Sequence, residues 1–248
     1  MKKLMVLGGV ITTVLLSQGL FADDWGSAKI NKEVRLALAD KAIIQLNIDV
    51  GAGDLSIMGK SNQSEIQVIA KVYGEDLNED EYTLSLEKVD DKAVLVAHFK
   101  NNTYNNERID LEVSLPSSMA LIVDDRSGDV LIQSVSNGLT LNDRSGDIEL
   151  KNIAGLVKIE DRSGDVIGQD IRGDMLINDR SGDIQLEDIE GNVNIDDSSG
   201  DIRVKQATGI VTVDDSSGDI DIDGATDFIL KSDGSGDVYL RNIQRDMK

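Results

Sequence analysis

Apolar residues in the second half of the chain recur two positions apart, and this alternation repeats every 18 residues. A Ser-Gly-Asp tripeptide marks the phase of the repeat. Its seven copies begin, without insertion or deletion, at Ser127, Ser145, Ser163, Ser181, Ser199, Ser217 and Ser235. A short fixed period of this kind is typical of a solenoid, in which each repeat stacks on its neighbours.

Aligning the chain at this period produces five apolar columns. One column contains Ile132, Leu150, Gly168, Leu186, Val204, Ile222 and Leu240. Two columns in the second half of the unit end in Ile229 and Lys231, and the second of these is an abrupt departure from the apolar pattern. A spacing of two is the period of a β-strand, and β-branched residues, which strands favour, dominate the columns.

Each repeat is therefore predicted to form two short strands and two turns. Parallel stacking at about 4.8 Å per coil would bury the columns as continuous ladders and give a rod of about 34 Å. The predicted fold class is all-β, a parallel β-solenoid (β-helix) with 18-residue coils and a packed core. The run that ends in Lys231 predicts a distorted last turn, as expected of a terminal repeat.

Residues 23–120 also alternate, but without the strict period. We expect a β-rich region that starts and caps the solenoid, which would itself occupy residues 121–248. Within the first region Gly51 to Ile57 read GAGDLSI, a degenerate version of the repeat that is out of phase with the others. Pro116, the only proline, lies at the junction, consistent with its exclusion from central strands.

Residues 1–22 have the pattern of a secretory signal peptide. Lys2 and Lys3 precede an apolar stretch that is short for a membrane span, and small or neutral residues lead to a predicted cleavage after Ala22. An uncleaved anchor is the alternative. The chain has no cysteine, which excludes disulfides, lipoprotein acylation and thiol chemistry, so the exported protein must rely on its core.

The formal net charge is −21, and cleavage would remove two lysines and no acid, leaving about −23. Such a chain is a poor candidate for binding nucleic acid or anionic lipid. The acids concentrate in the turns. One row precedes each tripeptide and comprises Asp125, Asp143, Asp161, Asp179, Asp197, Asp215 and Asp233. The second row ends each tripeptide and comprises Asp129, Asp147, Asp165, Asp183, Asp201, Asp219 and Asp237.

Stacked carboxylates repel one another, so something must compensate. In the structural interpretation the aspartates accept backbone N–H groups, glycine takes a positive φ, and a row of arginines neutralises the acids. That row is Arg126, Arg144, Arg162 and Arg180. The alternative is a bound Ca²⁺, favoured where the arginine is lost, at Asp196 to Asp201 and Asp214 to Asp219. No other cofactor is predicted.

Catalysis is the third interpretation of these turns, because paired carboxylates serve polysaccharide-cleaving enzymes as acid and base. In a repeat protein, however, an active site would occur in one repeat and interrupt the pattern, whereas this acidic cluster recurs in all seven copies. We therefore predict no enzyme and no catalytic, cofactor-binding or metal-binding residues. His98 is the only histidine and is expected on one face of a strand. Arg172-Gly173-Asp174 matches an integrin-binding tripeptide, but its glycine falls in the ordinary turn column of the repeat, so chance explains the match better.

The arrangement resembles a known family. The resemblance rests on the segments IIQLNIDVGAGDLSIMG and IDLEVSLP and on the recurring SGDIxL and GxVxI, and it covers about residues 30–243. They are similar to the bacterial DUF4097 family of β-strand-repeat proteins, which carry the label adhesin. The resemblance implies an exported β-helical protein without established enzymatic activity, and the family defines no functional residues to carry over.

We therefore expect a non-enzymatic, exported β-solenoid with a structural or adhesin-like role at the bacterial cell envelope. The alternatives are a periplasmic envelope-stress or signalling accessory that binds a partner protein, and an acidic rod stabilised by Ca²⁺. The expected location is the periplasm, the cell surface or the exterior. The partner would be an envelope or extracellular protein or glycan, and not a nucleic acid; the oligomeric state stays open.

Overall fold

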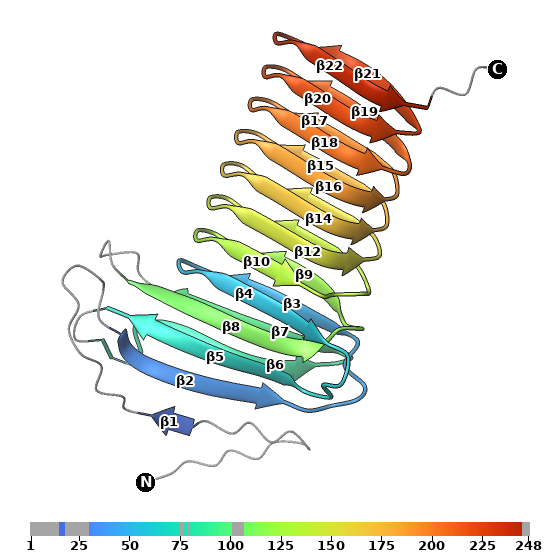
Figure 1. Ribbon diagram of the computed structural model, residues 1–248. Coiled ribbons are helices and arrows are strands. Elements are labelled where there is room, and N and C mark those ends of the chain that lie inside the picture. The colour runs from blue at the N-terminus through green and yellow to red at the C-terminus, as the bar shows by residue number, and fades with distance from the viewer. Residues whose placement is uncertain (1–14, 18–29, 75–76, 79, 101–106, 245–248) are drawn as a thin grey trace.

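A computed structural model describes residues 15–17, 30–74, 77–78, 80–100 and 107–244. Within these residues the chain is all-β and forms a rod of stacked coils that widens at its N-terminal end (Figure 1). The predicted cleavage site and most of the predicted signal peptide lie outside the described residues. The described part contains no helix that is long and apolar enough to cross a membrane.

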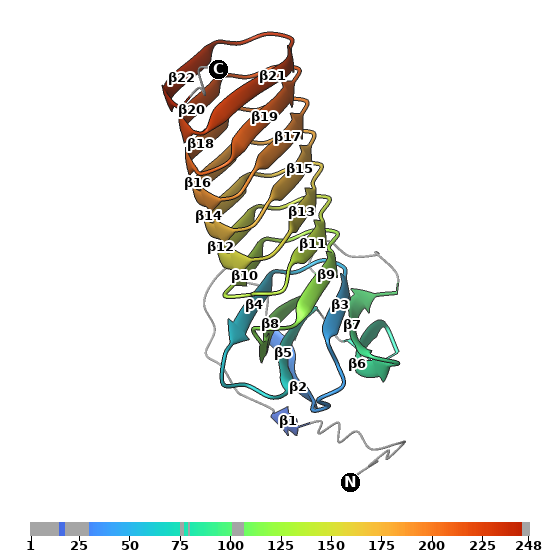
Figure 2. The same ribbon diagram turned by 90° about the vertical axis from the view of Figure 1, so that its right-hand side faces the viewer.

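Two sheets build the rod and face each other across the core (Figure 2). The strands of the first sheet are, in spatial order, β1 (Leu15–Ser17), β2 (Ile30–Leu38), β5 (Ile66–Tyr73), β8 (Arg108–Pro116), β4 (Leu55–Lys60), β10 (Val130–Gln133), β12 (Ile148–Ala154), β14 (Val166–Arg172), β16 (Ile184–Glu190), β18 (Ile202–Ala207), β20 (Ile220–Ala225) and β22 (Val238–Ile243). The strands of the second sheet are β21 (Asp227–Asp233), β19 (Ile210–Asp215), β17 (Val193–Asp197), β15 (Met175–Asp179), β13 (Val157–Glu160), β11 (Leu139–Asn142), β9 (Ala120–Asp124), β3 (Gln45–Val50), β7 (Lys92–Phe99) and β6 (Tyr82–Val89).

The 18-residue period is the register of the stack. Val130 pairs with Ile148, and Ile148 pairs with Val166, one coil further along a parallel ladder. The alternating apolar residues point inward and join one continuous buried cluster. The predicted fold class, a parallel β-solenoid with coils of about 18 residues, is confirmed.

The out-of-phase segment GAGDLSI belongs to the same stack. Strand β4 pairs in parallel with β10, which places Leu55 beside Val130, and Ala52 forms a bridge with Ser127. On its other side β4 pairs in parallel with β8, while β3 lies between β7 and β9. The coil β3–β4 is therefore inserted between β7–β8 and β9–β10, although β5 to β8 follow it in the sequence. Both sheets continue across residue 120, and the division of the chain there stays a prediction.

The two ends of the rod differ. Strands β2, β5 and β6 pair antiparallel with their neighbours and approach one another at the N-terminal end. At the other end β21 and β22 each pair on one side only, and the inward-facing Leu230 and Leu240 are 39% and 38% exposed. The described part of the rod is thus closed at one end and open at the other.

The last coil corrects the sequence alignment. Val211 pairs with Phe228 and Val213 with Leu230, so the expected inward residues Ile229 and Lys231 are one position late. The register then shifts, and Asp215 pairs with Asp233 as the period requires. Lys231 is the extra residue of this bulge, a device that is common on edge strands because it disrupts further pairing. The predicted distortion is confirmed, but Phe228, not Ile229, packs against the core.

Candidate functional site: the repeated corner

The Ser-Gly-Asp tripeptides form one corner of every coil, between a strand of the second sheet and a strand of the first. The glycine is required there for two reasons. Gly164 has a φ of 134°, and a Cβ at its position would lie 1.9 Å from the carbonyl oxygen of Gly146. A side chain would therefore meet both backbone strain and the neighbouring coil.

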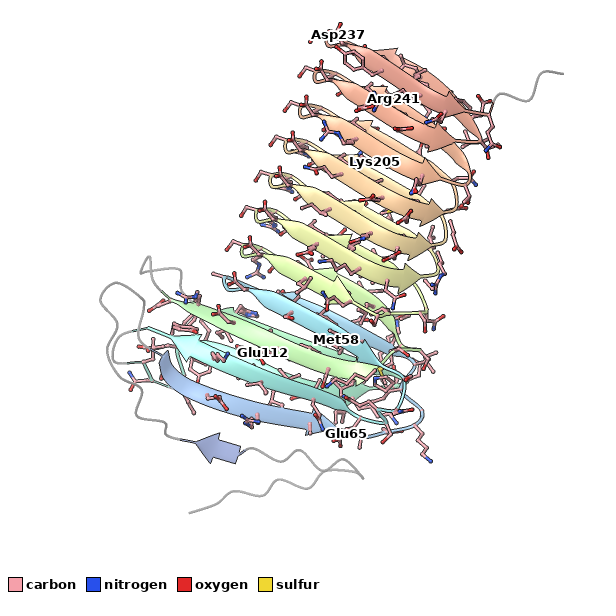
Figure 3. All side chains as sticks on the ribbon, viewed as in Figure 1. Met58, Glu65, Glu112, Lys205, Asp237 and Arg241 are labelled. Atoms are coloured by element: carbon pink, nitrogen blue, oxygen red, sulfur yellow. The ribbon has the colours of Figure 1, made fainter. Side chains whose placement is uncertain are left out.

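The aspartates that end the tripeptides connect the coils. The backbone N–H of Asp147 donates to Asp129 Oδ1 at 3.1 Å, and that of Asp183 donates to Asp165 Oδ1 at 2.9 Å. The ladder extends to Asp54 in the inserted coil, whose Oδ1 accepts from the N–H of Asp129 at 3.2 Å. At the opposite end it reaches Asp237, labelled in Figure 3. These carboxylates thus act as acceptors for corner N–H groups.

The aspartates that precede the tripeptides point into the core. They are at most 3% exposed from Asp125 through Asp215. Oδ1 of Asp161 accepts the N–H groups of Arg162 and Ser163, at 2.6 and 3.3 Å. Its Oδ2 is buried and has no hydrogen-bond partner in the described structure. The same holds for Oδ2 of Asp143, Asp179, Asp197 and Asp215. We call these residues, with Asp125, the inner aspartate ladder.

Burial changes the acidity of the inner aspartate ladder. Desolvation, followed by the charge of Asp143, raises the pKa of Asp125 to about 8. Desolvation also raises the pKa of Asp161 and of Asp197 to about 7, with smaller contributions from neighbouring aspartates. The pKa values of Asp143, Asp179 and Asp215 are raised in the same way. A protonated carboxyl avoids the cost of a buried charge, so this environment shifts each of these groups toward the neutral acid.

The arginines do not compensate these acids as expected. Arg126 pairs with Asp49, with 3.5 Å between Nη2 and Oδ1. Arg144, Arg162 and Arg180 form no ion pair with any described residue, and all three are exposed. From Asp143 to Asp215, backbone N–H groups rather than arginines hydrogen-bond the inner aspartate ladder.

The carboxylates of the arginine-free corners accept backbone N–H groups. Oδ1 of Asp197 accepts from the N–H of Ser199, and Oδ1 of Asp215 from that of Ser217. Asp201 Oδ1 accepts the N–H of Asp219. Ca²⁺ takes six to eight oxygen ligands. No group of three or more acidic, histidine or cysteine side chains within the described ranges is arranged to hold a metal ion. These two corners thus use their oxygens as the other corners do.

The remaining sequence candidates lie apart from one another. Asp174 of the Arg-Gly-Asp tripeptide lies at the opposite corner of the coil, between β14 of the first sheet and β15 of the second. Its Oδ1 accepts the N–H of Asn192 in the next coil at 2.8 Å, as the aspartates of the Ser-Gly-Asp corner do. His98 lies on β7, pairs across to Thr83 of β6, and has a buried Nδ1 without a hydrogen-bond partner in the described structure. Among the described residues it belongs to no group of three or more side chains that could hold a metal ion.

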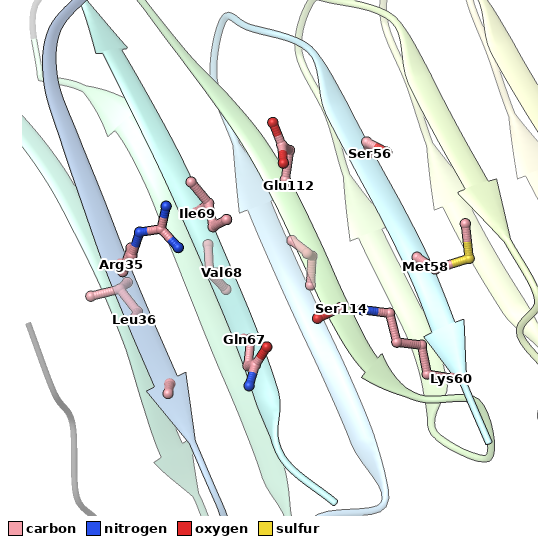
Figure 4. Close-up of a pocket in the computed structure, with 12 residues that line it drawn as sticks. Arg35, Leu36, Ser56, Met58, Lys60, Gln67, Val68, Ile69, Glu112 and Ser114 are labelled. Atoms are coloured by element: carbon pink, nitrogen blue, oxygen red, sulfur yellow. The ribbon is translucent and has the colours of Figure 1, made fainter. Parts of the chain in front are cut away.

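Two larger hollows lie near the N-terminal end. One, of about 520 Å³, lies on the outer face of β2, β5, β8 and β4, where Arg35, Ile69 and Met58 line it (Figure 4). The other, of about 620 Å³, lies by the opposite corner and is lined by Lys60, Arg172 and several serines. Neither brings together the residues that the sequence had singled out at the Ser-Gly-Asp corner.

A structural column in the opposite corner was missed from the sequence. Residues there adopt a left-handed backbone without being glycine, with φ between 53° and 60°. The column consists of Ser134, Asn152, Asp170, Asp188, Gln206 and Asn242, and Gly224 continues it at φ 90°. Asparagine, aspartate and glycine tolerate this conformation best. Their recurrence at period 18 was the signal that could have identified it.

The geometry defines a protein of the β-solenoid class whose corners are built from a repeated acidic turn. Comparison with known families agrees: the Toastrack DUF4097 family model matches residues 43–247. The chain belongs to this family, and the resemblance inferred from the sequence is confirmed.

Solved structures with the same fold include two bacterial proteins described as candidate adhesins. The protein from Bacteroides fragilis is 17% identical, with a TM-score of 0.57 over 84% of this chain and 97% of that one. The protein from Parabacteroides distasonis is 15% identical, with a TM-score of 0.50 over 84% and 97%. At this identity the likeness shows the fold alone. No curated protein matches the chain.

Proposed function

We propose that this protein is a non-enzymatic β-solenoid with a structural or adhesive role at the bacterial cell envelope. One observation carries the proposal: the acidic cluster that resembles an active site recurs in every coil and is used there by the fold. Its outer carboxylates accept N–H groups of the next coil, as Asp129 does from Asp147. Its inner carboxylates are buried, as Asp161 is.

The comparisons support the same role. The two neighbours that share the fold are described as candidate adhesins. Export rests on the signal-peptide pattern of residues 1–22, and the absence of cysteine fits a rod that depends on its own core. A rod of stacked coils, such as the described residues form, is suited to spacing a binding surface away from an attachment point.

Localisation and adhesion test the proposal together. Intact producing cells are treated with protease, and the protein is followed by immunoblot beside a periplasmic and a surface marker. Digestion together with the surface marker, and loss of attachment by a deletion strain to host or abiotic surfaces, would support surface adhesion. Protection in intact cells, with digestion after the outer layer is opened, would favour the periplasmic accessory that binds a partner protein. Detection only in the cytoplasm would contradict both.

A further inference from the structure

Three exposed arginines form a row along the repeated corner. Arg144, Arg162 and Arg180 stand one coil apart, about 4.8 Å in a parallel ladder. None of them has an ion-pair partner among the described residues, whereas Arg126, which begins the same column, pairs with Asp49. The chain carries 46 acidic and 25 basic residues, so unpaired arginines are unexpected in it. Like charges at this separation repel one another.

A shallow hollow of about 290 Å³ follows this row. The three arginines line it together with Asn142, Glu160 and Asn178. The nearby acids offer little opposing charge. Lys158 on the same strand pairs with Glu160. Asp143 and Asp161 also line the hollow, but both residues are buried, and burial raises the pKa values of their carboxyls. The hollow therefore presents three guanidinium groups, two amides and the ion-paired carboxylate of Glu160, and Asp124 also lines it.

Guanidinium groups are planar and can donate two parallel hydrogen bonds to a carboxylate or sulfate, which a lysine ammonium cannot do with the same geometry. A row of them matches an extended ligand that carries repeated anionic groups. The side-chain amides of Asn142 and Asn178 can both donate and accept, as sugar hydroxyls require. We propose that the hollow along Arg144, Arg162 and Arg180 binds an acidic polysaccharide, with carboxylate or sulfate groups held by successive coils.

The composition argues against the other common polyanions. Single-stranded nucleic acids bind proteins through aromatic stacking as well as charge, and no aromatic side chain lines this hollow. A densely charged polyphosphate would be repelled by a chain with a formal net charge of −21. An acidic sugar chain is less densely charged, and its hydroxyls can use the polar groups between the arginines.

The row also has defined ends. Arg126 is occupied by Asp49, and the column continues beyond Arg180 with Ser198 and Ser216. The free cations therefore span three coils, about 10 Å from the first to the third. This length limits the contact to a short segment of a sugar chain and predicts that adding one more arginine would lengthen the site.

This inference deepens the proposed adhesive role by naming a ligand class, and it is tested with the purified full-length protein. Fluorescently labelled oligogalacturonate and a labelled chondroitin sulfate oligosaccharide serve as carboxylate and sulfate probes, with neutral dextran as a blank. We expect saturable binding of at least one acidic probe that weakens as salt is raised. The triple variant Arg144→Gln/Arg162→Gln/Arg180→Gln should bind about tenfold or more weakly, because three charge-assisted contacts are lost.

A charge-matched control separates this site from a general field effect. The variant Arg172→Gln/Arg203→Gln/Lys205→Gln removes the same three charges from exposed positions outside the hollow, and should bind as the unaltered protein does. Relative to the unaltered protein, the variant Ser198→Arg should gain affinity for long probes and gain less for short ones. Thermal unfolding checks that each variant is folded.

The inference would be overturned if neither acidic probe binds, or if single-stranded DNA or polyphosphate binds more tightly than both sugars. It would also be overturned if the two triple variants lose affinity equally, or if Ser198→Arg leaves the affinity for long probes unchanged. Lack of sugar binding with surface attachment intact would reject the ligand class and leave the adhesive role standing. Sugar binding by a protein found only in the cytoplasm would reject the adhesive role and leave the ligand class standing.

Discussion

The backbone N–H of Asp165 donates a hydrogen bond to Oδ1 of Asp147 at 3.0 Å, and this bond joins two successive coils at their corner. Similar bonds recur along the rod from Asp110 to Asp237. At a corner the chain leaves the sheet, and the side chain of the preceding coil supplies the acceptor. The third residue of the Ser-Gly-Asp tripeptide is therefore a connection between coils.

Removing one of these acceptors should destabilise the rod by a modest amount. In Asp147→Ala the N–H of Asp165 loses its partner, which should lower the free energy of unfolding by about 1 kcal/mol. Asp147→Asn retains an acceptor oxygen and should change it by less than about half as much. Urea unfolding of both variants measures the difference. Equal destabilisation by alanine and asparagine would show that the charge, rather than the acceptor, matters.

The inner aspartate ladder should make stability depend on pH. The pKa of Asp161 is raised from 3.8 to about 7, so between these values the folded protein holds a proton that the unfolded chain has released. The buried carboxyl of Asp161 therefore contributes most to stability when it is protonated. That contribution is fully present below about pH 4 and is lost as pH rises through about 7. In Asp161→Asn the amide oxygen can still accept from Arg162 and Ser163. The variant should unfold at a higher temperature than the unaltered protein at pH 8, with a smaller difference at pH 5.

The control for this experiment is Asp147→Asn, which removes a carboxylate from the exposed outer row instead of the buried one. Calorimetry of the three proteins at pH 5 and pH 8 provides the comparison. If the melting temperatures of Asp161→Asn and of the unaltered protein differ equally at both pH values, the inner aspartate ladder does not hold protons in the way that its burial implies.

The corner glycines should tolerate no side chain. Gly164→Ala places a Cβ 1.9 Å from Gly146 O at a φ of 134°, and we expect a loss of several kcal/mol or failure to fold. Gly224→Ala also has a positive φ, 90°, but its Cβ would lie 3.4 Å from the nearest atom. This variant should lose only about 1 kcal/mol, from backbone strain. Soluble yield and urea midpoints compare the two, and similar losses would mean that the close approach of the coils is not the cause.

The fold was largely predictable because the register of a stack is the period of its sequence. An apolar column such as Val130, Ile148 and Val166 states which residues are neighbours. Departures within a column can be compensated between columns, which a sequence alignment does not show. Gly168 leaves a gap in its column. Leu186 of the next coil fills it most closely, with Cδ2 2.9 Å from where a Cβ of Gly168 would lie, and Met175 from the opposite sheet also reaches it, with Cε at 3.6 Å.

The order of the N-terminal coils could not be predicted. The coil that contains Leu55 is inserted beside Val130, 75 positions later in the sequence, and no period records that contact. The candidate site was predicted in part. Turn chemistry identified the aspartates as acceptors of N–H groups. The assumption that arginine neutralises nearby acids failed, because the acids of the inner ladder are buried and the arginines face outward.

Leu186 and Leu240 occupy the same column in the middle and at the open end of the rod, and they should contribute very different amounts to stability. Leu186 is 2% exposed between coils on both sides, whereas Leu240 is 38% exposed and has a neighbour on one side only. Leu186→Ala should lower the free energy of unfolding by about 2–5 kcal/mol, since it leaves a cavity. Leu240→Ala should lower it by less than about 1 kcal/mol, because solvent already reaches the site. Urea unfolding gives both values, and hydrogen exchange should find the amides of β22 opening more readily than those of β16. If Leu240→Ala is as costly as Leu186→Ala, or if β22 exchanges as slowly as β16, the end of the rod is covered in solution by another copy or another chain.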